Sequence, residues 1–325
     1  MNTTVLTTGG TIASTDSDGG PKPTQTGEEL LEAVPELESH AELTIEDVAQ
    51  VPSFEMDGET LEEIGERVRE LDTDSAVDTV VITHGTDTME ETAYYLDVTT
   101  QPETPVFLTG AQRRPDEVSP DGPSNLLTAV RAGRAFRERD AGGTFVAFDE
   151  EIHSARYVTK THTSALDAFQ STDAGPVAHV DRDGVAIHRP PRSETDPIEA
   201  TSLERPVYTI KSGTGVTGEL LEAALECGAE GLVVEGTGLG NATPGLAEGV
   251  RDAVESGVPV VVTSRCLEGR VTPAYGGDGG GERLREYGAI FGEDRSPRQA
   301  RLRLALALEA VDDLESIRAV FEADA

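Results

Sequence analysis

Short runs of hydrophobic residues alternate along the chain with segments whose apolar positions have helical spacing. Strand-like runs are predicted at 3–8, 43–51, 78–83, 105–109, 144–148, 206–211, 231–235 and 258–263. Helical patterns lie between them, at 57–71, 87–97, 122–137, 217–227 and 244–256. Strands that alternate with helices in this way are typical of parallel βαβ units, so the sequence predicts an α/β fold.

Two of the helical segments are informative in detail. In 57–71 apolar residues recur at helical spacing from Leu61 to Leu71, and Asp57 stands where a helix N-cap is expected. The segment 298–308 (RQARLRLALAL) has leucines that alternate as in a strand. Its Arg, Gln, Ala and Leu all favour helix, so we predict a helix there as well.

A Pro-rich, polar stretch at 189–205 interrupts the alternation of strands and helices. It has no apolar period and is typical of an interdomain linker. We therefore expect a larger N-terminal domain at 1–190, a linker at 191–205 and a smaller C-terminal domain at 206–325. Both are predicted to be α/β domains with mostly parallel sheets.

The charge balance narrows the classes of partner. The chain has 61 Asp and Glu against 26 Lys and Arg, a formal net charge of -35, and we find no basic patch. Nucleic acid and anionic lipid surfaces are therefore not expected as partners. Only three of the positive charges are Lys, and aromatic residues make up 4% of the chain. An acidic, Lys-poor composition is typical of a cytosolic protein from cells that hold molar salt, where the Debye length falls to about 3 Å. The alternative is an acidic mesophilic protein, against which the shortage of Lys argues.

The remaining composition indicates a cytoplasmic protein. Cys227 and Cys266 form no C-x-x-C motif, so neither a disulfide framework nor a metal site is expected, and we predict that both are buried apolar side chains. No apolar run approaches 18 residues, and the N-terminus lacks the basic and apolar regions of a signal peptide. No cofactor is expected.

The first candidate for chemistry is the stretch TTGGTIAST, which follows the first predicted strand. Gly9 and Gly10 allow a tight turn and a close approach of backbone to a ligand. Thr11 comes next, at the carboxyl end of a strand, where open α/β sheets bind ligands. Neither of the two common phosphate-binding glycine motifs is present. The alternative is a simple turn that ends a strand and has Thr as a cap.

The second candidate lies in VVITHGTDTMEETAYYL, where a hydrophobic strand again ends in a glycine turn. Thr86 and Asp87 stand at the start of a helix, and an Asp there can bind a substrate ammonium. In the alternative interpretation one of these two residues is only the N-cap of the helix. We expect His84, beside a buried strand, to be structural.

The third candidate is Lys160, which stands in an uncharged stretch of a chain that nearly avoids Lys. Unlike Arg, Lys can give up its proton, and a desolvated Lys can activate a Thr hydroxyl as a nucleophile. A surface Lys that only covers apolar atoms is the alternative. Thr nucleophiles, a Lys base and an Asp anchor at one sheet edge together suit acyl transfer from an amide, with backbone N–H groups available to an oxyanion.

Several of these stretches resemble the bacterial-type L-asparaginases, and the resemblance spans nearly the whole chain in order. It is carried by TGGTIAS at 8–14, THGTDTMEETAYYLD at 83–97, TGAQRRPDEVSPDGPSNL at 109–126, VTKTHTS at 158–164 and GLGNATPG at 238–245. The family implies a larger N-terminal and a smaller C-terminal α/β domain, and a homo-oligomer, usually a tetramer built from close dimers. It also implies L-asparagine as the small-molecule substrate.

The resemblance implies a role for each matching residue. Thr11 would attack the side-chain amide of asparagine, release ammonia and carry a β-aspartyl ester that water then hydrolyses. Thr86 and Lys160 would form the second catalytic set with Asp87, whose carboxylate also holds the substrate α-ammonium. Ser53 matches the Ser that helps to bind the substrate α-carboxylate.

The chain departs from the family at three places. The loop after the first motif normally carries a Tyr, but 14–27 has none and Thr24 stands near its place, so either another Tyr substitutes or Lys160 activates Thr11 through Thr86. Phe54 is expected at the substrate, where the family commonly has Gln.

The third departure concerns the residues that reach the site from a neighbouring protomer. Asn241 matches the family's intersubunit Asn. Because the stretch YGGDGGGERLREYGAI is rich in glycine, Glu282 is only the nearest candidate for the family's intersubunit Glu.

Two other functions remain open from the sequence. The archaeal amidotransferase subunit of the route to glutaminyl-tRNA resembles an asparaginase with an additional N-terminal domain, for which a first motif at Thr8 leaves no room. That subunit would also need a basic face for tRNA. A non-catalytic amino-acid-binding protein is the second alternative, and the presence of Thr11, Thr86, Asp87 and Lys160 argues against it. Some glutaminase activity stays open, because one methylene is worth only about 1–3 kcal/mol in a fitted pocket.

The charge of -35 generates a prediction about salt. Repulsion among carboxylates is screened in molar KCl and is not screened in millimolar KCl, so we expect the melting temperature to fall as salt is removed. Calorimetry across a KCl series measures this fall. An unchanged melting temperature would contradict the prediction.

Overall fold

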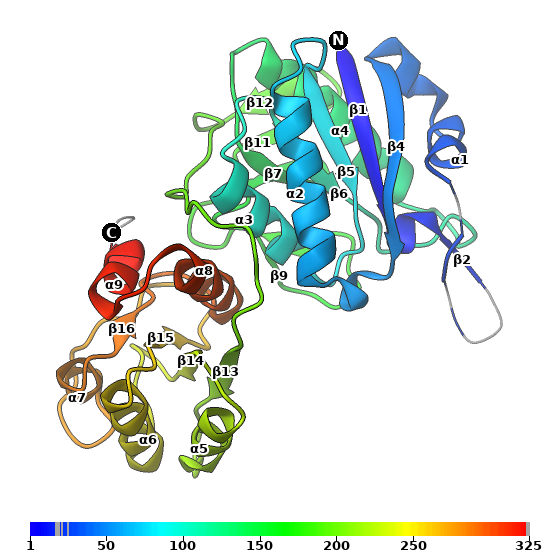
Figure 1. Cartoon of the computed structure of the whole chain (residues 1–325). Coiled ribbons are helices and arrows are strands. Elements are labelled where there is room, and N and C mark those ends of the chain that lie inside the picture. The colour runs from blue at the N-terminus through cyan, green and yellow to red at the C-terminus, as the bar shows by residue number, and fades with distance from the viewer. Residues whose placement is uncertain (17–19, 21, 25, 323–325) are drawn as a thin grey trace. The chain divides into compact units, whose positions relative to one another are not determined.

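Each half of the chain is built around its own β-sheet, with helices on both faces of the sheet (Figure 1). The computed structural model describes residues 1–16, 20, 22–24 and 26–322. The chain divides into two units, Met1–Pro197 and Ile198–Ala325. The segment 189–205, which the structure describes in full, contains no helix or strand.

The sheet of the N-terminal unit has the strand order β12-β11-β8-β7-β6-β5-β1-β4. Five strands are parallel to one another: β1 (Asn2–Gly9), β4 (Glu42–Val51), β5 (Thr79–Thr83), β6 (Val106–Thr109) and β7 (Thr144–Phe148). Three short strands extend the sheet in antiparallel fashion: β8 (Glu151–Ser154), β11 (Ala178–Val180) and β12 (Val185–Ile187). The sequence did not predict these three, because runs of three or four residues are too short to show a period.

Helices cover both faces of this sheet. On one face lie α2 (Gly58–Asp72) and α3 (Met89–Thr100), and on the other α4 (Gly122–Arg137) packs on β5, β6 and β7 (Figure 1). The smaller elements are α1 (Gly27–Glu32), the 3-10 turns η1 (Thr11–Ala13), η2 (Pro35–Ser39) and η3 (Ser53–Glu55), and the paired strands β2 (Ser14–Thr15) with β3 (Lys22–Pro23) and β9 (Thr159–Lys160) with β10 (Phe169–Gln170). Where α4 packs on the sheet, the ring of Phe136 contacts those of Phe107 and Phe145, with ring centroids 5.0–5.5 Å apart within the group.

The C-terminal unit has a parallel four-stranded sheet in the order β13-β14-β15-β16. The strands are β13 (Val207–Lys211), β14 (Gly231–Gly236), β15 (Val260–Ser264) and β16 (Ile290–Phe291). One face packs on α5 (Glu219–Glu226), α6 (Pro244–Glu255) and α7 (Gly281–Glu286), and the other on α8 (Pro297–Ala310) and α9 (Leu314–Glu322) (Figure 1). The mixed α/β architecture with mostly parallel sheets is the predicted one.

The helix predicted at 298–308 is confirmed as α8. Ser296 and Gln299 form a capping box at its start, so the helix begins with its backbone donors satisfied. Leu302, Leu304 and Leu306 are all buried, because α8 packs between the sheet and α9. A helix that is covered on two sides shows leucines at alternate positions, which explains the strand-like pattern.

Side chains that accept backbone N–H groups mark the starts of α2, α6 and α8, and α3 begins without such a cap. Asp57 caps α2 as predicted, because its carboxylate accepts the N–H of Thr60. The predicted start of the next helix at residue 87 is wrong, since α3 begins at Met89 with Thr88 as N-cap. Thr86 and Asp87 remain in the turn before it, so their side chains are not used as caps.

Both cysteines are exposed, so the prediction that they are buried is wrong. Cys227 is the residue that ends α5, and Cys266 lies in the loop after β15. Cys227 follows a helix with one buried face, and Cys266 follows a buried strand, and at both places the chain has already left the core. No helix within the described ranges combines the length and the apolar character that a membrane span requires.

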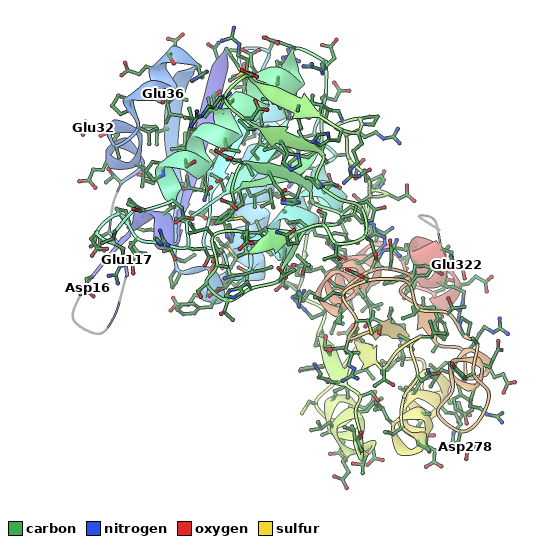
Figure 2. All side chains as sticks on the ribbon, turned by 180° about the vertical axis from the view of Figure 1, so that it is seen from behind. Asp16, Glu32, Glu36, Glu117, Asp278 and Glu322 are labelled. Atoms are coloured by element: carbon green, nitrogen blue, oxygen red, sulfur yellow. The ribbon has the colours of Figure 1, made fainter. Side chains whose placement is uncertain are left out.

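Acidic side chains project from the surface of both units (Figure 2). The six that are labelled are all exposed: Asp16, Glu32, Glu36, Glu117, Asp278 and Glu322. The net charge of -35 is therefore carried largely where solvent ions can screen it.

Asp97 is a buried acid that ties the end of the N-terminal unit to α3. Its carboxylate accepts the hydroxyl of Thr195 at 2.8 Å and the N–H of Thr144 at 3.2 Å. The side chain of Gln101, at the end of α3, donates to the Asp97 carbonyl, to Ser193 and to Thr195. Burial raises the pKa of Asp97 to about 6, although these hydrogen bonds act in the opposite direction.

We expect Asp97 to make stability depend on pH. The folded-state pKa of about 6 lies above the ordinary value of 3.8, so the stabilising effect of the protonated acid is present below pH 4 and is lost as the pH rises through 6. The loss is on the order of 2–3 kcal/mol. Urea unfolding of the wild type and of Asp97→Asn in molar KCl measures it.

The asparagine variant does not titrate at this position. The free energy of unfolding of wild type minus that of Asp97→Asn should therefore fall from pH 4 to pH 6, because only the wild type loses stability at this position. A difference that stays constant would show that Asp97 titrates at its ordinary pKa.

Candidate active site

The candidate residues follow three neighbouring strands of the N-terminal sheet. The strands β4, β1 and β5 lie side by side and are parallel, with Gly9 opposite Val51 and Thr7 opposite Thr83 (Figure 1). The turns that follow these strands must therefore meet at one edge of the sheet. Ser53, Thr11 and Thr86 are carried by these three turns.

Two glycines allow the three turns to pack against one another. A Cβ atom on Gly10 would lie 2.4 Å from the backbone nitrogen of Gly85, and one on Gly85 would lie 2.5 Å from Oγ of Ser53. Gly10 also has a φ of +84°, which other residues rarely adopt. The turn of Thr11 thus lies on that of Thr86, which in turn lies on Ser53. The sequence indicated a glycine turn at both places, but not that the two turns contact each other.

Lys160 reaches two of the candidates through its ammonium group. Its Nζ donates to Oγ1 of Thr86 at 2.8 Å and to Oδ1 of Asp87 at 2.7 Å. The Lys160 side chain is 13% exposed and Asp87 is 59% exposed. The structure therefore brings together the three residues that the sequence proposed as base, hydroxyl and anchor, with the carboxylate facing solvent.

Ser53 is buried and connects its turn to the start of α3. Its Oγ accepts the N–H of Asp87 at 3.2 Å, and its carbonyl accepts the hydroxyl of Thr88 at 2.7 Å. Phe54, the next residue, is 70% exposed. The structure therefore leaves the Phe54 side chain largely in solvent.

His84 is fully buried, and both of its ring nitrogens make hydrogen bonds within the fold. Nδ1 lies 2.7 Å from the Gly85 carbonyl, which can only accept, so Nδ1 carries the proton and Nε2 accepts from Thr92 at 3.0 Å. Burial lowers the pKa of His84 to about 4. The ring therefore stays neutral at physiological pH and supports the turn that carries Thr86.

The backbone of Lys160 is held by a residue that the sequence did not propose. Its N–H donates to Oε2 of Glu90 at 3.2 Å, and Glu90 lies buried in the first turn of α3. The only sequence signal is that a Glu in the first turn of a helix is favoured by the helix dipole. That signal is common and does not identify a partner.

Thr24, at the place expected for the family's Tyr, pairs with another threonine. Its N–H donates to the carbonyl of Ala13, and its hydroxyl lies 2.8 Å from that of Thr15. The three tyrosines of the N-terminal unit lie elsewhere in the fold. Tyr94 and Tyr95 are buried on α3, and the ring of Tyr157 lies under the guanidinium groups of two arginines.

Asn241 and Glu282 belong to the C-terminal unit, where they lie close in the fold. The side-chain oxygen of Asn241 accepts the N–H of Gly281, the first residue of α7, at 3.1 Å. Glu282 follows directly and pairs with Arg285 at 2.5 Å. Within the described part of the chain, no group of three or more His, Cys, Asp or Glu residues is arranged to hold a metal ion.

Family models match both units of this fold. The model "Asparaginase, N-terminal" matches residues 2–193, and the model "Glutaminase/Asparaginase C-terminal domain" matches residues 206–321. The chain belongs to the asparaginase family.

Individual relatives agree with this assignment to the asparaginase family. "L-asparaginase 2" of Bacillus subtilis is 36% identical, and the match covers 98% of this chain and 86% of the relative. The crystal structure of "Probable Cytoplasmic L-asparaginase" from Campylobacter jejuni superposes with a TM-score of 0.88 at 32% identity, over 99% of both chains. A glutamyl-tRNA(Gln) amidotransferase component from Thermococcus kodakarensis is 37% identical over 97% of this chain and 73% of its own length.

Proposed function

We propose that this chain is an amidohydrolase that converts L-asparagine to L-aspartate and ammonia. The observation that carries the proposal is the contact of the Lys160 ammonium with the Thr86 hydroxyl and the Asp87 carboxylate, in a turn that packs on that of Thr11. This arrangement supplies a base, two hydroxyls and an anion at one sheet edge. The names and the full-length match of the asparaginase relatives support the same reaction.

In the proposed reaction Thr11 is the nucleophile. Its Oγ forms a bond to the side-chain amide carbon of asparagine, and the C–N bond then breaks. Because a charged amine cannot accept a proton, the reaction starts from Lys160 that has lost one proton to solvent. It can then remove the hydroxyl proton of Thr11 by way of Thr86, and that proton leaves on ammonia. Water next cleaves the β-aspartyl ester on Thr11 by the same acid–base route.

Two charges of the substrate have candidate partners. Asp87, more than half exposed, would bind the α-ammonium, and Ser53 would bind the α-carboxylate. In the structure the Asp87 carboxylate already contacts Lys160, so a bound α-ammonium would share that negative charge. We propose that Phe54 lies against the bound substrate and that Asn241 of a neighbouring copy completes the site.

The amidotransferase function is the second candidate, because the Thermococcus kodakarensis relative is as similar as the asparaginases. The match covers 73% of the length of that protein. A protein of this kind would deliver its ammonia to a partner protein. Release of ammonia from free asparagine by the purified chain distinguishes the two functions.

We also propose a cytoplasmic, homo-oligomeric protein that works in molar salt. The name of the Campylobacter jejuni neighbour supports the location, and the acidic, Lys-poor surface supports the salt requirement. Light scattering of the purified chain in molar KCl gives the oligomeric state.

The experiment that tests the proposal is ammonia release from L-asparagine and L-glutamine in molar KCl, by wild type and Thr11→Ala. We expect wild type to hydrolyse asparagine, with a loss of at least about 1,000-fold in kcat for the variant. Glutamine should react roughly 10–200-fold less well, because its extra methylene must fit the same pocket.

Each other outcome contradicts part of the proposal. Equal turnover by both proteins would remove Thr11 as the nucleophile. Binding of asparagine without turnover, or turnover only with a partner protein, would replace the asparaginase function with one of the two alternatives.

A further inference from the structure

We propose that Glu90 is a positioning residue for Lys160, an inference that rests on the proposed function of Lys160 as the base. Glu90 holds the backbone of Lys160, while Thr86 and Asp87 hold its ammonium. Residues 86–90 are one short segment. A single turn of chain therefore contacts both ends of the same lysine.

The hairpin that carries Lys160 is too short to fix the lysine by itself. It consists of β9 and β10, with two residues each, and pairs Lys160 with Phe169 and Thr159 with Gln170. An isolated hairpin of this length has little stability of its own. Its position must come from contacts with the rest of the unit.

The backbone N–H of Lys160 makes one such contact, and the buried ring of Phe169, its partner in the hairpin, makes another by packing on Phe148 of β7 with centroids 5.0 Å apart. In an antiparallel pair, residues alternate between exchanging hydrogen bonds across the pair and directing them outward. The N–H of the next residue, Thr161, stays inside the hairpin and donates to Ala168 at 2.7 Å. That of Lys160 instead donates to Oε2 of Glu90, which ties the hairpin to the first turn of α3.

The position of this backbone governs where the ammonium can reach. A lysine side chain has four methylenes, so a shift of its Cα changes how far the side chain must extend for the Nζ to reach Thr86. A displacement of about 1 Å at a catalytic group can cost on the order of 100-fold in rate. Glu90 itself is buried within a helix whose start is fixed by the bond from Thr88 to Ser53. Glu90 therefore ties the Lys160 backbone to a helix that is itself joined to the Ser53 turn.

Three substitutions of Glu90 distinguish the length of its side chain from its negative charge. Glu90→Gln keeps an oxygen at the same reach and removes the charge. Glu90→Asp keeps the charge but is one methylene shorter, and Glu90→Ala removes both. Glu219→Gln is the matched control, because Glu219 is an exposed Glu in the first turn of α5 in the C-terminal unit.

The first readout is the reactivity of Lys160 toward an acylating reagent, measured by mass spectrometry without any turnover. The chain has only three lysines, and Lys211, 67% exposed, is the internal reference. We expect the labelling of Lys160 relative to Lys211 to rise at least threefold in Glu90→Ala and Glu90→Asp. In Glu90→Gln and Glu219→Gln it should stay within twofold of wild type.

The second readout is the steady-state kinetics of asparagine hydrolysis. We expect kcat to fall at least tenfold in the Ala and Asp variants at position 90, with KM within threefold of wild type, while Gln restores kcat to within threefold. A structural defect alone would lower the melting temperature and change kcat and KM together. If Glu90→Ala does not fold, the comparison of Asp with Gln decides the question.

Two results would overturn the proposal. In the first, Glu90→Ala and Glu90→Asp both show the same Lys160 labelling and the same kcat as wild type. The other is an active Asp variant beside an inactive Gln variant, which would make the charge of Glu90 the important property. If wild type releases no ammonia at all, the proposed function fails, and the labelling still tests the contact between Glu90 and Lys160.

Discussion

The arrangement of the candidate site depends on the contact between two glycine turns. Gly10 and Gly85 follow neighbouring parallel strands, and their backbones approach so closely that a Cβ on Gly10 would lie 2.4 Å from the next turn. Thr11 and Thr86 each stand one residue beyond these glycines. The distance between Thr11 and Thr86 is therefore set by the packing of one backbone on another. Such packing deforms less easily than a contact between side chains. A larger residue at Gly10 would push these two turns apart, and one at Gly85 would push the second turn away from Ser53.

Helix α3 keeps these turns in place because it is held at both ends. At its start, Thr88 donates to the carbonyl of Ser53, and Thr92 pairs with the buried ring of His84. At its end, Asp97 and Gln101 bind the segment around residues 193–195. Burial disfavours the charged form of a side chain, and it therefore raises the pKa of Asp97 and lowers that of His84. The helix that follows the turn of Thr86 and Asp87 is therefore fixed by polar contacts inside the unit.

Much of the fold follows from the sequence, and the failures have physical causes. Parallel strands with long hydrophobic runs and helices with a full apolar stripe were predicted, since both produce a period over many residues. The antiparallel strands β8, β11 and β12 were missed because their pairing partners, and not their own pattern, define them. The same holds for the site. Thr86, Asp87 and Lys160 could be proposed from their residue types, and the glycine turn before Thr86 could be recognised. The close approach at Gly85 and the contact of Glu90 with Lys160 depend on the folded chain.

The central claim is that Thr11, beside the set formed by Thr86, Asp87 and Lys160, carries the reacting acyl group. The most direct test is to mix the protein with saturating L-asparagine in molar KCl, quench the mixture in acid within one turnover and map the modified peptide by mass spectrometry. The account predicts an aspartyl ester on Thr11. An ester on Thr86, or steady turnover with every peptide unmodified, would contradict it.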